Sequence, residues 1–348
     1  MVAGTVVGVD IDTRAIRAVE VRSSAKAGGG EIVRVGSVEL PDGAVRGGEV
    51  VEPGTVSDAL RGLWASTKFS TKRVALGFGG SKAFARDVLL PRVPLDRVRE
   101  SLPFTVQEMI PLPVAEAILD FYPAGEEVLE EGPMLRGILV AAQKDAVRAL
   151  VNSAMKAKLS PASVDLNAFG MLRATEPLGG SSDVVVVVGV TASTTNIVIA
   201  QGGVPRFVRM VAIGGDDITA SIARRLQISA AQAEHAKQHY GIMTTTATAA
   251  ERPVIEAIYG ASWDLLTGIR DTLAYFASSP ASPRVDRMSI TGDGADFPGF
   301  DTVLADLVKL PVTRGGLTGA ARMSKPAADG AAIDASLVAY GLALGSSR

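Results

Sequence analysis

The two halves of this chain open with the same succession of local patterns, and this repeat restricts the fold more than any other feature. In the first half, an apolar segment at residues 5–9 is followed by a polar turn at residues 10–14 and an alternating segment. In the second half, an apolar segment at residues 183–190 is followed by a hydroxyl-rich turn at residues 191–195 and another apolar segment. Short apolar or alternating segments bounded by polar turns predict β-strands. The repeat therefore predicts an α/β fold with two related lobes that face a cleft.

Composition excludes several classes of protein. The 348 residues include 35 basic and 37 acidic side chains, a balance that differs from the basic surface of a nucleic-acid-binding protein. The chain has no cysteine, so disulfides, cysteine zinc sites and thiol nucleophiles are excluded. The apolar strip at residues 184–190 is far shorter than the roughly 20 residues of a membrane helix, and residues 1–8 lack the basic stretch of a signal peptide. We therefore expect a soluble, cytoplasmic protein without direct nucleic-acid binding or membrane insertion.

Hydrophobic periodicity predicts the other helices and strands. Apolar residues at helical spacing predict helices at residues 56–66, 96–110, 144–158, 254–277 and 335–344, and two more after residues 214–215 and around residues 233–237. Further strands are predicted at residues 31–40, 73–79, 137–142, 205–211 and 285–291. The acidic stretch at residues 124–132 is predicted to be a loop.

Prolines divide the first half of the chain. Five prolines between residues 91 and 113 break any long helix there and set residues 81–158 apart as a unit. We predict a first lobe (1–80, with 159–182 as its return and a linker), an inserted subdomain (81–158), a second-lobe core (183–226 and 285–330), a helical subdomain of the second lobe (227–284) and a C-terminal helix that returns to the first lobe (331–348).

Three turns contain residue types that contact ligands, and each also has an ordinary structural interpretation. The turn at residues 10–14 combines acids with backbone N–H groups, as a phosphate or metal site does, but a polar hairpin turn has the same composition. The turn at residues 191–195 offers hydroxyls and amides, which equally satisfy the backbone of a Ser/Thr turn. Gly292 and Gly294 let a ligand approach the backbone between a strand and a helix. The chain has no P-loop sequence, and Phe297 takes the place of the third glycine of a dinucleotide-binding fingerprint.

Two pairs of polar residues share one predicted helix. His235 and His239 lie four residues apart, a spacing that allows metal chelation, but Ala236 stands where an HExxH metalloprotease has its glutamate. A solvated helix face is the ordinary alternative for the histidines. An exposed ion pair is the ordinary alternative for Glu234 and Lys237.

The order of these motifs resembles the actin-like ATPase superfamily, and within it the family of FtsA and PilM. The resemblance is carried by the two turns, by Ala-Glu-x-x-Lys at 233–237 and by Thr-Gly-x-Gly-Ala at 291–295. It is most specific in VLLPRVPLDRVRESLPFTVQEMIPLPVAEAILDFYP (88–123), and it includes IGGDDITASIARRL (213–226) and VAYGLALG (338–345). The resemblance implies an actin-like two-lobed fold, in which related α/β lobes surround a nucleotide cleft, with an inserted subdomain of the FtsA/PilM type.

The resemblance also implies a nucleotide site with ATP and magnesium as cofactors, the magnesium being held by Asp10. The residues that it places around the nucleotide are Asp10, Asp12, Thr13, Arg14 and Arg17 in the first phosphate loop; Thr191, Ser193, Thr194 and Thr195 in the second; Gly214 and Gly215 near the phosphates; Glu234 and Lys237 at the ribose and adenine; and Gly292, Asp293, Gly294 and Ala295 behind the adenosine.

The chain departs from the family pattern at the phosphates. Gly189 and Thr191 stand where the family has Asp-x-Gly, and the missing aspartate is the one that positions the metal and the attacking water. Asp12 and Asp293 replace glycines, and a carboxylate repels phosphate unless a cation intervenes. We therefore expect weak or absent hydrolysis, and the departures leave open whether nucleotide is still bound.

The family resemblance implies a cytoplasmic scaffold of type IV pilus assembly. Such a scaffold would bind the N-terminal cytoplasmic peptide of a PilN-like inner-membrane protein, in a groove between the first lobe and the inserted unit, and would thereby be recruited to the inner face of the cytoplasmic membrane. Other pilus assembly components and self-association are further expected interactions. The alternatives are an FtsA-like filament-forming protein and a phosphotransferase of the actin-like and sugar-kinase superfamily, which would need an acid in place of Gly189.

Overall fold

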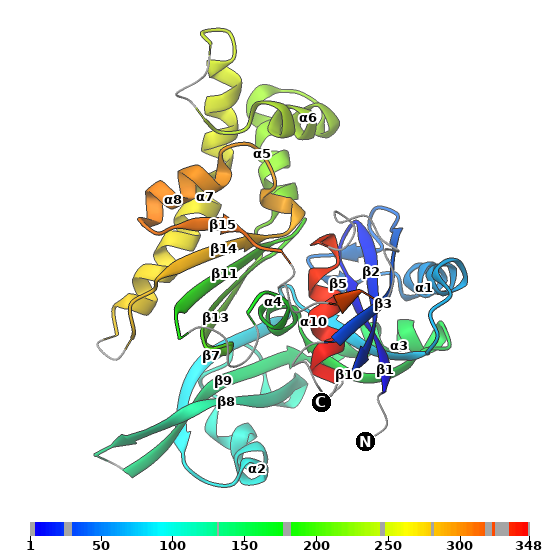
Figure 1. The fold of residues 1–348 in the computed structure, drawn as a ribbon, viewed down its shortest axis with the longest axis vertical. Helices are drawn as coiled ribbons and strands as arrows, with labels where there is room; N and C mark the ends of the chain where they lie inside the picture. The colour runs from blue at the N-terminus through cyan, green and yellow to red at the C-terminus, as the bar shows by residue number, and fades with distance from the viewer. Residues whose placement is uncertain are drawn as a thin grey trace.

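Both predicted strand–turn–strand openings form in the computed structural model. It describes residues 4–23, 30–130, 132–176, 182–243, 248–279, 282–316, 322–323 and 334–346. In the first half, β1 (Thr5–Ile11) pairs with β2 (Ala15–Ser23), and in the second half β11 (Val184–Val190) pairs with β12 (Thr195–Gln201), both antiparallel. Each pair lies inside a larger sheet, and the two sheets define two lobes (Figure 1).

The first lobe is built on a six-stranded sheet. Its strand order is β10-β6-β1-β2-β3-β16, and β6 runs parallel to both β1 and β10. The other elements of this lobe are β3 (Gly30–Glu39), β4 (Val45–Arg46), β5 (Glu49–Val50), α1 (Pro53–Thr67), β6 (Arg73–Phe78), α3 (Lys144–Lys156), β10 (Ser160–Leu166) and β16 (Arg322–Met323). Helix α1 starts three residues before the predicted start, because Pro53 suits the first turn of a helix.

Helix α3 belongs by its packing to the first lobe. Its buried residues join the hydrophobic core of α1 and the six-stranded sheet, although it was predicted within the unit 81–158. The boundaries of that unit stay a prediction.

The second lobe is built on a five-stranded sheet. Its strand order is β13-β12-β11-β14-β15, with β11 parallel to β14. All seven residues of β11 are buried, because strands flank it on both sides and both faces of the sheet are covered. The remaining elements are β13 (Val204–Val211), α5 (Gly215–Leu226), α6 (Ala230–Tyr240), α7 (Arg252–Ala277), β14 (Arg287–Thr291), η3 (Asp293–Ala295), α8 (Phe300–Val308) and β15 (Val312–Arg314).

A three-stranded antiparallel sheet lies beside both lobes, at the bottom of Figure 1. Its strand order is β7-β9-β8, and α2 packs on it in a core of its own. The elements are β7 (Ala83–Pro91), α2 (Leu95–Thr105), η1 (Val114–Glu116), β8 (Ala117–Leu129) and β9 (Gly132–Gln143). Helix α2 ends at Thr105, five residues before the predicted end.

The loop predicted at residues 124–132 is wrong. Strand β8 continues to Leu129 and pairs with β9 along this length. The acidic residues are compatible with a strand because β8 is at the edge of the sheet, where charged side chains reach solvent. Glu127 also forms an ion pair with Arg136 of the neighbouring strand, which stabilises the hairpin.

Helices α4 (Asn167–Thr175) and α10 (Leu337–Ser346) lie between the two lobes (Figure 1). They contribute to one hydrophobic cluster that also contains valines of β1, β2, β11 and β12. The two helices cross closely, since a Cβ added to Gly341 would lie 1.7 Å from the carbonyl oxygen of Gly170. The linker expected after α4 at residues 177–182 lies outside the described residues, except for Ser182. In the described part of the chain, no helix combines the length and apolar composition that a membrane crossing requires.

We predict that Gly341→Ala destabilises the protein, because the added methyl group overlaps backbone atoms that cannot rotate away. Overpacking of this kind costs roughly 1–3 kcal/mol in the free energy of unfolding. Gly268→Ala in α7 is the matched control, since a Cβ there meets no atom within 4 Å. Alanine at an open helical position is expected to be neutral or to stabilise by roughly 0.5–1 kcal/mol. Equal urea midpoints for the two variants would contradict this account of the α4–α10 contact.

Candidate functional site

A cavity of about 380 Å³ lies between the two lobes at the ends of β1, β11 and β14. Both lobes and both interlobe helices contribute to its wall. The lining residues are Asp10, Asp12, Arg17, Asn167, Met171, Gly189, Thr191, Asn196, Ile290, Thr291, Gly292, Asp293, Asp296, Arg314, Gly315, Asp334, Ala335, Leu337 and Val338. We call this space the interlobe cavity.

The predicted nucleotide residues divide into two groups. Six of them line the interlobe cavity: Asp10, Asp12, Arg17, Thr191, Gly292 and Asp293. The others lie beside it, in the two turns, at the start of α5 and η3, and on α6: Thr13, Arg14, Ser193, Thr194, Thr195, Gly214, Gly215, Glu234, Lys237, Gly294 and Ala295. Their roles in nucleotide binding stay predictions.

Side chains of the two lobes contact each other directly across the cleft. The hydroxyls of Thr13 and Ser193 are 3.1 Å apart, which joins the tips of the two turns. Arg14 forms an ion pair with Asp216 at the start of α5. Arg17 donates to the carboxylate of Asp293 at 3.0 Å. The lobes are therefore bridged by groups of the chain itself.

Several backbone amides around the second turn already have acceptors. The N–H of Thr191 donates to the carbonyl of Thr194 at 2.8 Å, as in a turn that satisfies its own backbone. At the start of α5, Gly215 and Asp216 donate to carbonyls of the same turn at 2.9 and 2.8 Å, and Gly214 donates to the Asp217 carboxylate at 2.8 Å. A helix N-terminus binds anions through unpaired N–H groups, and these three are paired.

Asp10 and Asp12 are buried carboxyls, 6% and 7% exposed. Burial, and then the charge of Asp12, raise the pKa of Asp10 from its ordinary 3.8 to about 7, although Arg17 and a hydrogen bond from Asn167 oppose the shift. Burial also raises the pKa of Asp12, which accepts hydrogen bonds from the backbone N–H groups of Thr13 and Ala192. Asp12, which stands where the family has a glycine, thus accepts a hydrogen bond from the backbone N–H of Ala192 in the opposite turn.

Glu234 and Lys237 form a buried network between α6 and α5. Lys237 is 1% exposed, so the exposed ion pair considered from the sequence is wrong. Its ammonium donates to Glu234 at 2.8 Å, to the Thr219 hydroxyl at 2.9 Å and to the Gly215 carbonyl at 3.3 Å. Burial alone would raise the pKa of Glu234, but hydrogen bonds from Lys237 and Thr219 bring it below its ordinary value. The ammonium is therefore committed to the protein.

The two histidines of α6 stack on each other, with ring centroids 5.9 Å apart. Within the described ranges, no three His, Asp or Glu side chains come together as metal ligands. The histidine pair thus has no third such ligand in this part of the chain, and the magnesium role of Asp10 stays a prediction.

The interlobe cavity does not fit a magnesium-bound triphosphate. The carboxylates in its wall outnumber the guanidiniums, and the amides of Thr191, Gly214, Gly215 and Asp216 are already paired. At Gly189, where the family has the metal-positioning aspartate, a Cβ would lie 2.4 Å from the sulfur of Met171. The space for that aspartate is filled by an apolar side chain, so the cavity lacks the group that would position magnesium and the attacking water.

A second cavity, of about 370 Å³, lies between the first lobe and the three-stranded sheet. The sequence analysis named no residues for this groove. Its lining residues are Phe78, Arg99, Ile118, Asp120, Phe121, Tyr122, Pro123, Val140, Ala142, Val147, Val164, Asp165, Leu166, Phe169 and Arg173. We call it the edge-strand groove. In the sequence, this groove could have been found from the apolar and aromatic side chains at 118–122, which lie in the segment of most specific resemblance.

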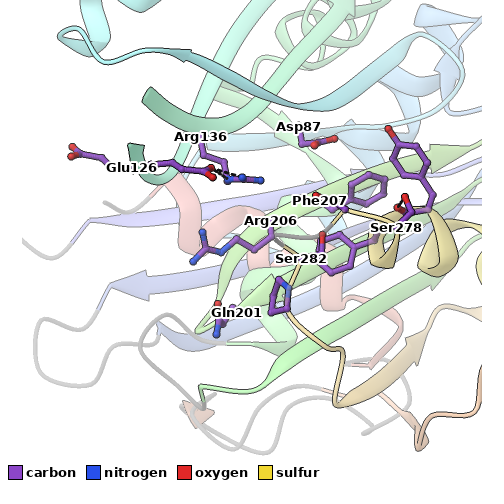
Figure 2. A pocket seen from close by; sticks show the side chains of 13 residues that line it. Asp87, Glu126, Arg136, Gln201, Arg206, Phe207, Ser278 and Ser282 are labelled. Carbon is purple, nitrogen blue, oxygen red and sulfur yellow. Dashed lines mark hydrogen bonds and ion pairs between the residues drawn. The ribbon is translucent and has the colours of Figure 1, made fainter. Parts of the chain in front are cut away.

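A third cavity, of about 570 Å³, separates the three-stranded sheet from the second lobe (Figure 2). Arg136 and Glu127 pair with each other on one wall, and Arg206 extends from β13 on the other. Phe207 and Phe276 pack at the second-lobe side, with ring centroids 6.0 Å apart. Its wall contains none of the predicted nucleotide residues.

Comparisons with known proteins agree on the family and the fold. The family model described as type IV pilus assembly protein PilM matches residues 8–347. A chain of the PilM-PilN type IV pilus biogenesis complex is similar at a TM-score of 0.85 and 23% identity, covering 99% of this chain and 98% of that chain. The ethanolamine utilization protein EutJ from Carboxydothermus hydrogenoformans follows at 0.57 and 14%, with 99% and 91% covered. MreB5 of Spiroplasma citri bound to ADP follows at 0.55 and 11%, with 97% and 94% covered. The predicted actin-like two-lobed fold is confirmed.

We predict that Asp10→Asn removes part of the pH dependence of stability. Between about pH 4 and pH 7 the folded wild type keeps a proton on Asp10 that the unfolded chain has released, because the pKa is about 7 in the fold. The free energy of unfolding then falls as the pH rises through this window, by at most about 1.4 kcal/mol per pH unit. Urea unfolding at several pH values measures how the free energy of unfolding depends on pH in the wild type and in the variant. Identical slopes in wild type and variant would rule out this titration of Asp10.

Proposed function

Because this chain belongs to the family of type IV pilus assembly proteins PilM, we propose that it is a pilus assembly scaffold that binds an extended peptide of a membrane-anchored partner in the edge-strand groove. The printed description of the relative with a TM-score of 0.85 names a complex of PilM with PilN. We therefore propose the N-terminal cytoplasmic peptide of a PilN-like inner-membrane protein as the occupant. Through it, this chain would reside in the cytoplasm and be recruited to the inner face of the cytoplasmic membrane.

The observation that carries the proposal is that two edge strands line one groove. β8 ends the three-stranded sheet and β10 ends the six-stranded sheet, and both contribute residues to the wall. An edge strand has backbone N–H and C=O groups that lack a strand partner on one side. An extended peptide can pair with such an edge, which provides affinity through its main chain.

Side chains in the groove form pockets that can bind the side chains of a peptide. Tyr122 and Phe169 pack against each other across the two units, with ring centroids 5.1 Å apart. Ile118, 42% exposed, lies further along β8 and offers an apolar contact. The charged side chains of the wall pair among themselves, as Arg173 does with Asp165. We therefore infer a peptide anchored by apolar side chains.

We predict that Ile118→Arg weakens binding of the partner peptide by about tenfold or more, because the loss of one buried apolar anchor costs roughly 1.5–3 kcal/mol. Fluorescence anisotropy of a labelled N-terminal PilN-like peptide measures the dissociation constant. Val128→Arg is the matched control: it changes another exposed β-branched residue of β8, 82% exposed, outside the groove wall. Equal losses of peptide affinity in both variants would show that the peptide binds outside this groove.

We also predict negligible release of phosphate from Mg-ATP by the purified protein. Catalysis would need an acid at position 189, and Met171 fills that space. A phosphate-release assay with and without the partner peptide checks this. Turnover stimulated by a small acceptor would favour a phosphotransferase instead, and filaments in the electron microscope would favour an FtsA-like protein. Self-association and other pilus components stay predictions.

A further inference from the structure

The interlobe cavity has the wrong charge for a phosphate and the right charge for a cation. Its wall contains five carboxylates, of Asp10, Asp12, Asp293, Asp296 and Asp334, and the guanidiniums of Arg17 and Arg314. Asp10 and Asp12 are buried, and the other three acids are exposed. An excess of carboxylates over guanidiniums repels anions and favours a ligand of opposite charge.

Both guanidiniums already form ion pairs within the protein. Arg17 pairs with Asp293 at 3.0 Å and lies 4.0 Å from Asp12. Arg314 lies 3.4 Å from Asp296 and donates to the carbonyl of Ala295 at 2.9 Å. The Asp10 side chain accepts from the neutral amide of Asn167 at 3.1 Å, and the charge of Arg17 offsets only part of the effect of burial on this carboxyl.

A second observation, independent of the acids, is an acceptor that lacks a donor. Asn196 is 4% exposed and lines the cavity, and its side-chain oxygen has no hydrogen-bond partner among the described residues. A buried acceptor without a donor costs roughly 1–3 kcal/mol. A ligand with N–H donors would satisfy this oxygen, whereas a phosphate, which has only acceptors when ionised, would not.

Part of the remaining wall is apolar. Met171, Ile290, Leu337 and Val338 line the cavity together with the polar residues. The acids are also not arranged as a metal centre within the described residues. An ammonium group on an aliphatic body matches both parts of the wall, because it supplies charge, donors and apolar surface in one molecule.

We propose that the interlobe cavity binds a small aliphatic amine in place of a nucleoside phosphate. A volume of about 380 Å³ lies within the range of small-molecule sites. The proposal goes beyond peptide docking and does not depend on it, since the edge-strand groove is a separate cavity with other lining residues.

The experiment is calorimetric titration of the full chain with cadaverine at pH 8, above the pKa of about 7 that burial gives Asp10. Pentanediol has the same carbon chain without charge, and glutarate has it with the opposite charge, so these two are the matched ligand controls. Mg-ATP and magnesium chloride alone complete the series. We expect saturable binding of cadaverine with a dissociation constant of about 1 mM or lower, and no binding of the other four.

Two variants place the amine in the cavity. Asp293→Asn removes a charge from a half-exposed position, so the fold is expected to survive. Asp10→Asn removes a buried charge while its side-chain oxygen can still accept from Asn167. Each is expected to weaken cadaverine binding by about tenfold, the size of one charge-assisted hydrogen bond. Asp306→Asn, on an exposed part of α8 outside the cavity, is the control and should bind as the wild type does.

The outcomes separate the proposal from its competitors. Cadaverine binding that is lost with Asp293→Asn and kept with Asp306→Asn supports an amine site. Saturable binding of Mg-ATP, or of magnesium alone, overturns it in favour of a nucleotide or metal site. The proposal also fails if the folded protein does not bind cadaverine, or if Asp293→Asn and Asp306→Asn bind it equally. The anisotropy assay with the partner peptide tests the edge-strand groove separately. The peptide proposal and the amine proposal can therefore fail independently.

Discussion

The close crossing of α4 and α10 is the contact on which both candidate sites depend. The backbones of Gly341 and Gly170 approach to a distance that leaves no room for a side chain, which lets the two helices share one thin layer between the lobe sheets. Helix α4 then serves as a wall for two cavities at once. Asn167 and Met171, four residues apart, face the interlobe cavity, while Phe169 lines the edge-strand groove. The position of this helix therefore sets the shape of both.

The interlobe cleft is bridged by the chain's own charges. In this structure the carboxylate of Asp12 accepts from the amide of Ala192 on the opposite turn, and Arg17 pairs with Asp293. An anion belonging to the protein thus makes a contact of the kind that a bound phosphate makes with backbone amides. These bonds join the two lobes directly through groups of the chain itself.

The edge-strand groove and the interlobe cavity differ in what they can recognise. The groove joins two sheet edges to aromatic side chains, and its charges are paired, so shape and main-chain bonding dominate there. In the wall of the interlobe cavity carboxylates outnumber guanidiniums, so charge dominates there. The two sites share α4 as a wall, which gives a physical route by which occupation of one could alter the other.

Local patterns in the sequence determined the repeated strand–turn–strand openings, most of the helices and the replacement of the family's aspartate by Gly189, because periodicity and single-residue identities are local properties. The strand at residues 124–129 could not be predicted from local sequence patterns, since it depends on pairing with another strand. The burial of Lys237 was hidden because its partners lie on another helix. Only the tertiary structure brought β8, β10 and α4 together around one groove, and only it showed Met171 in the space beside Gly189, because both depend on packing between segments far apart in the chain.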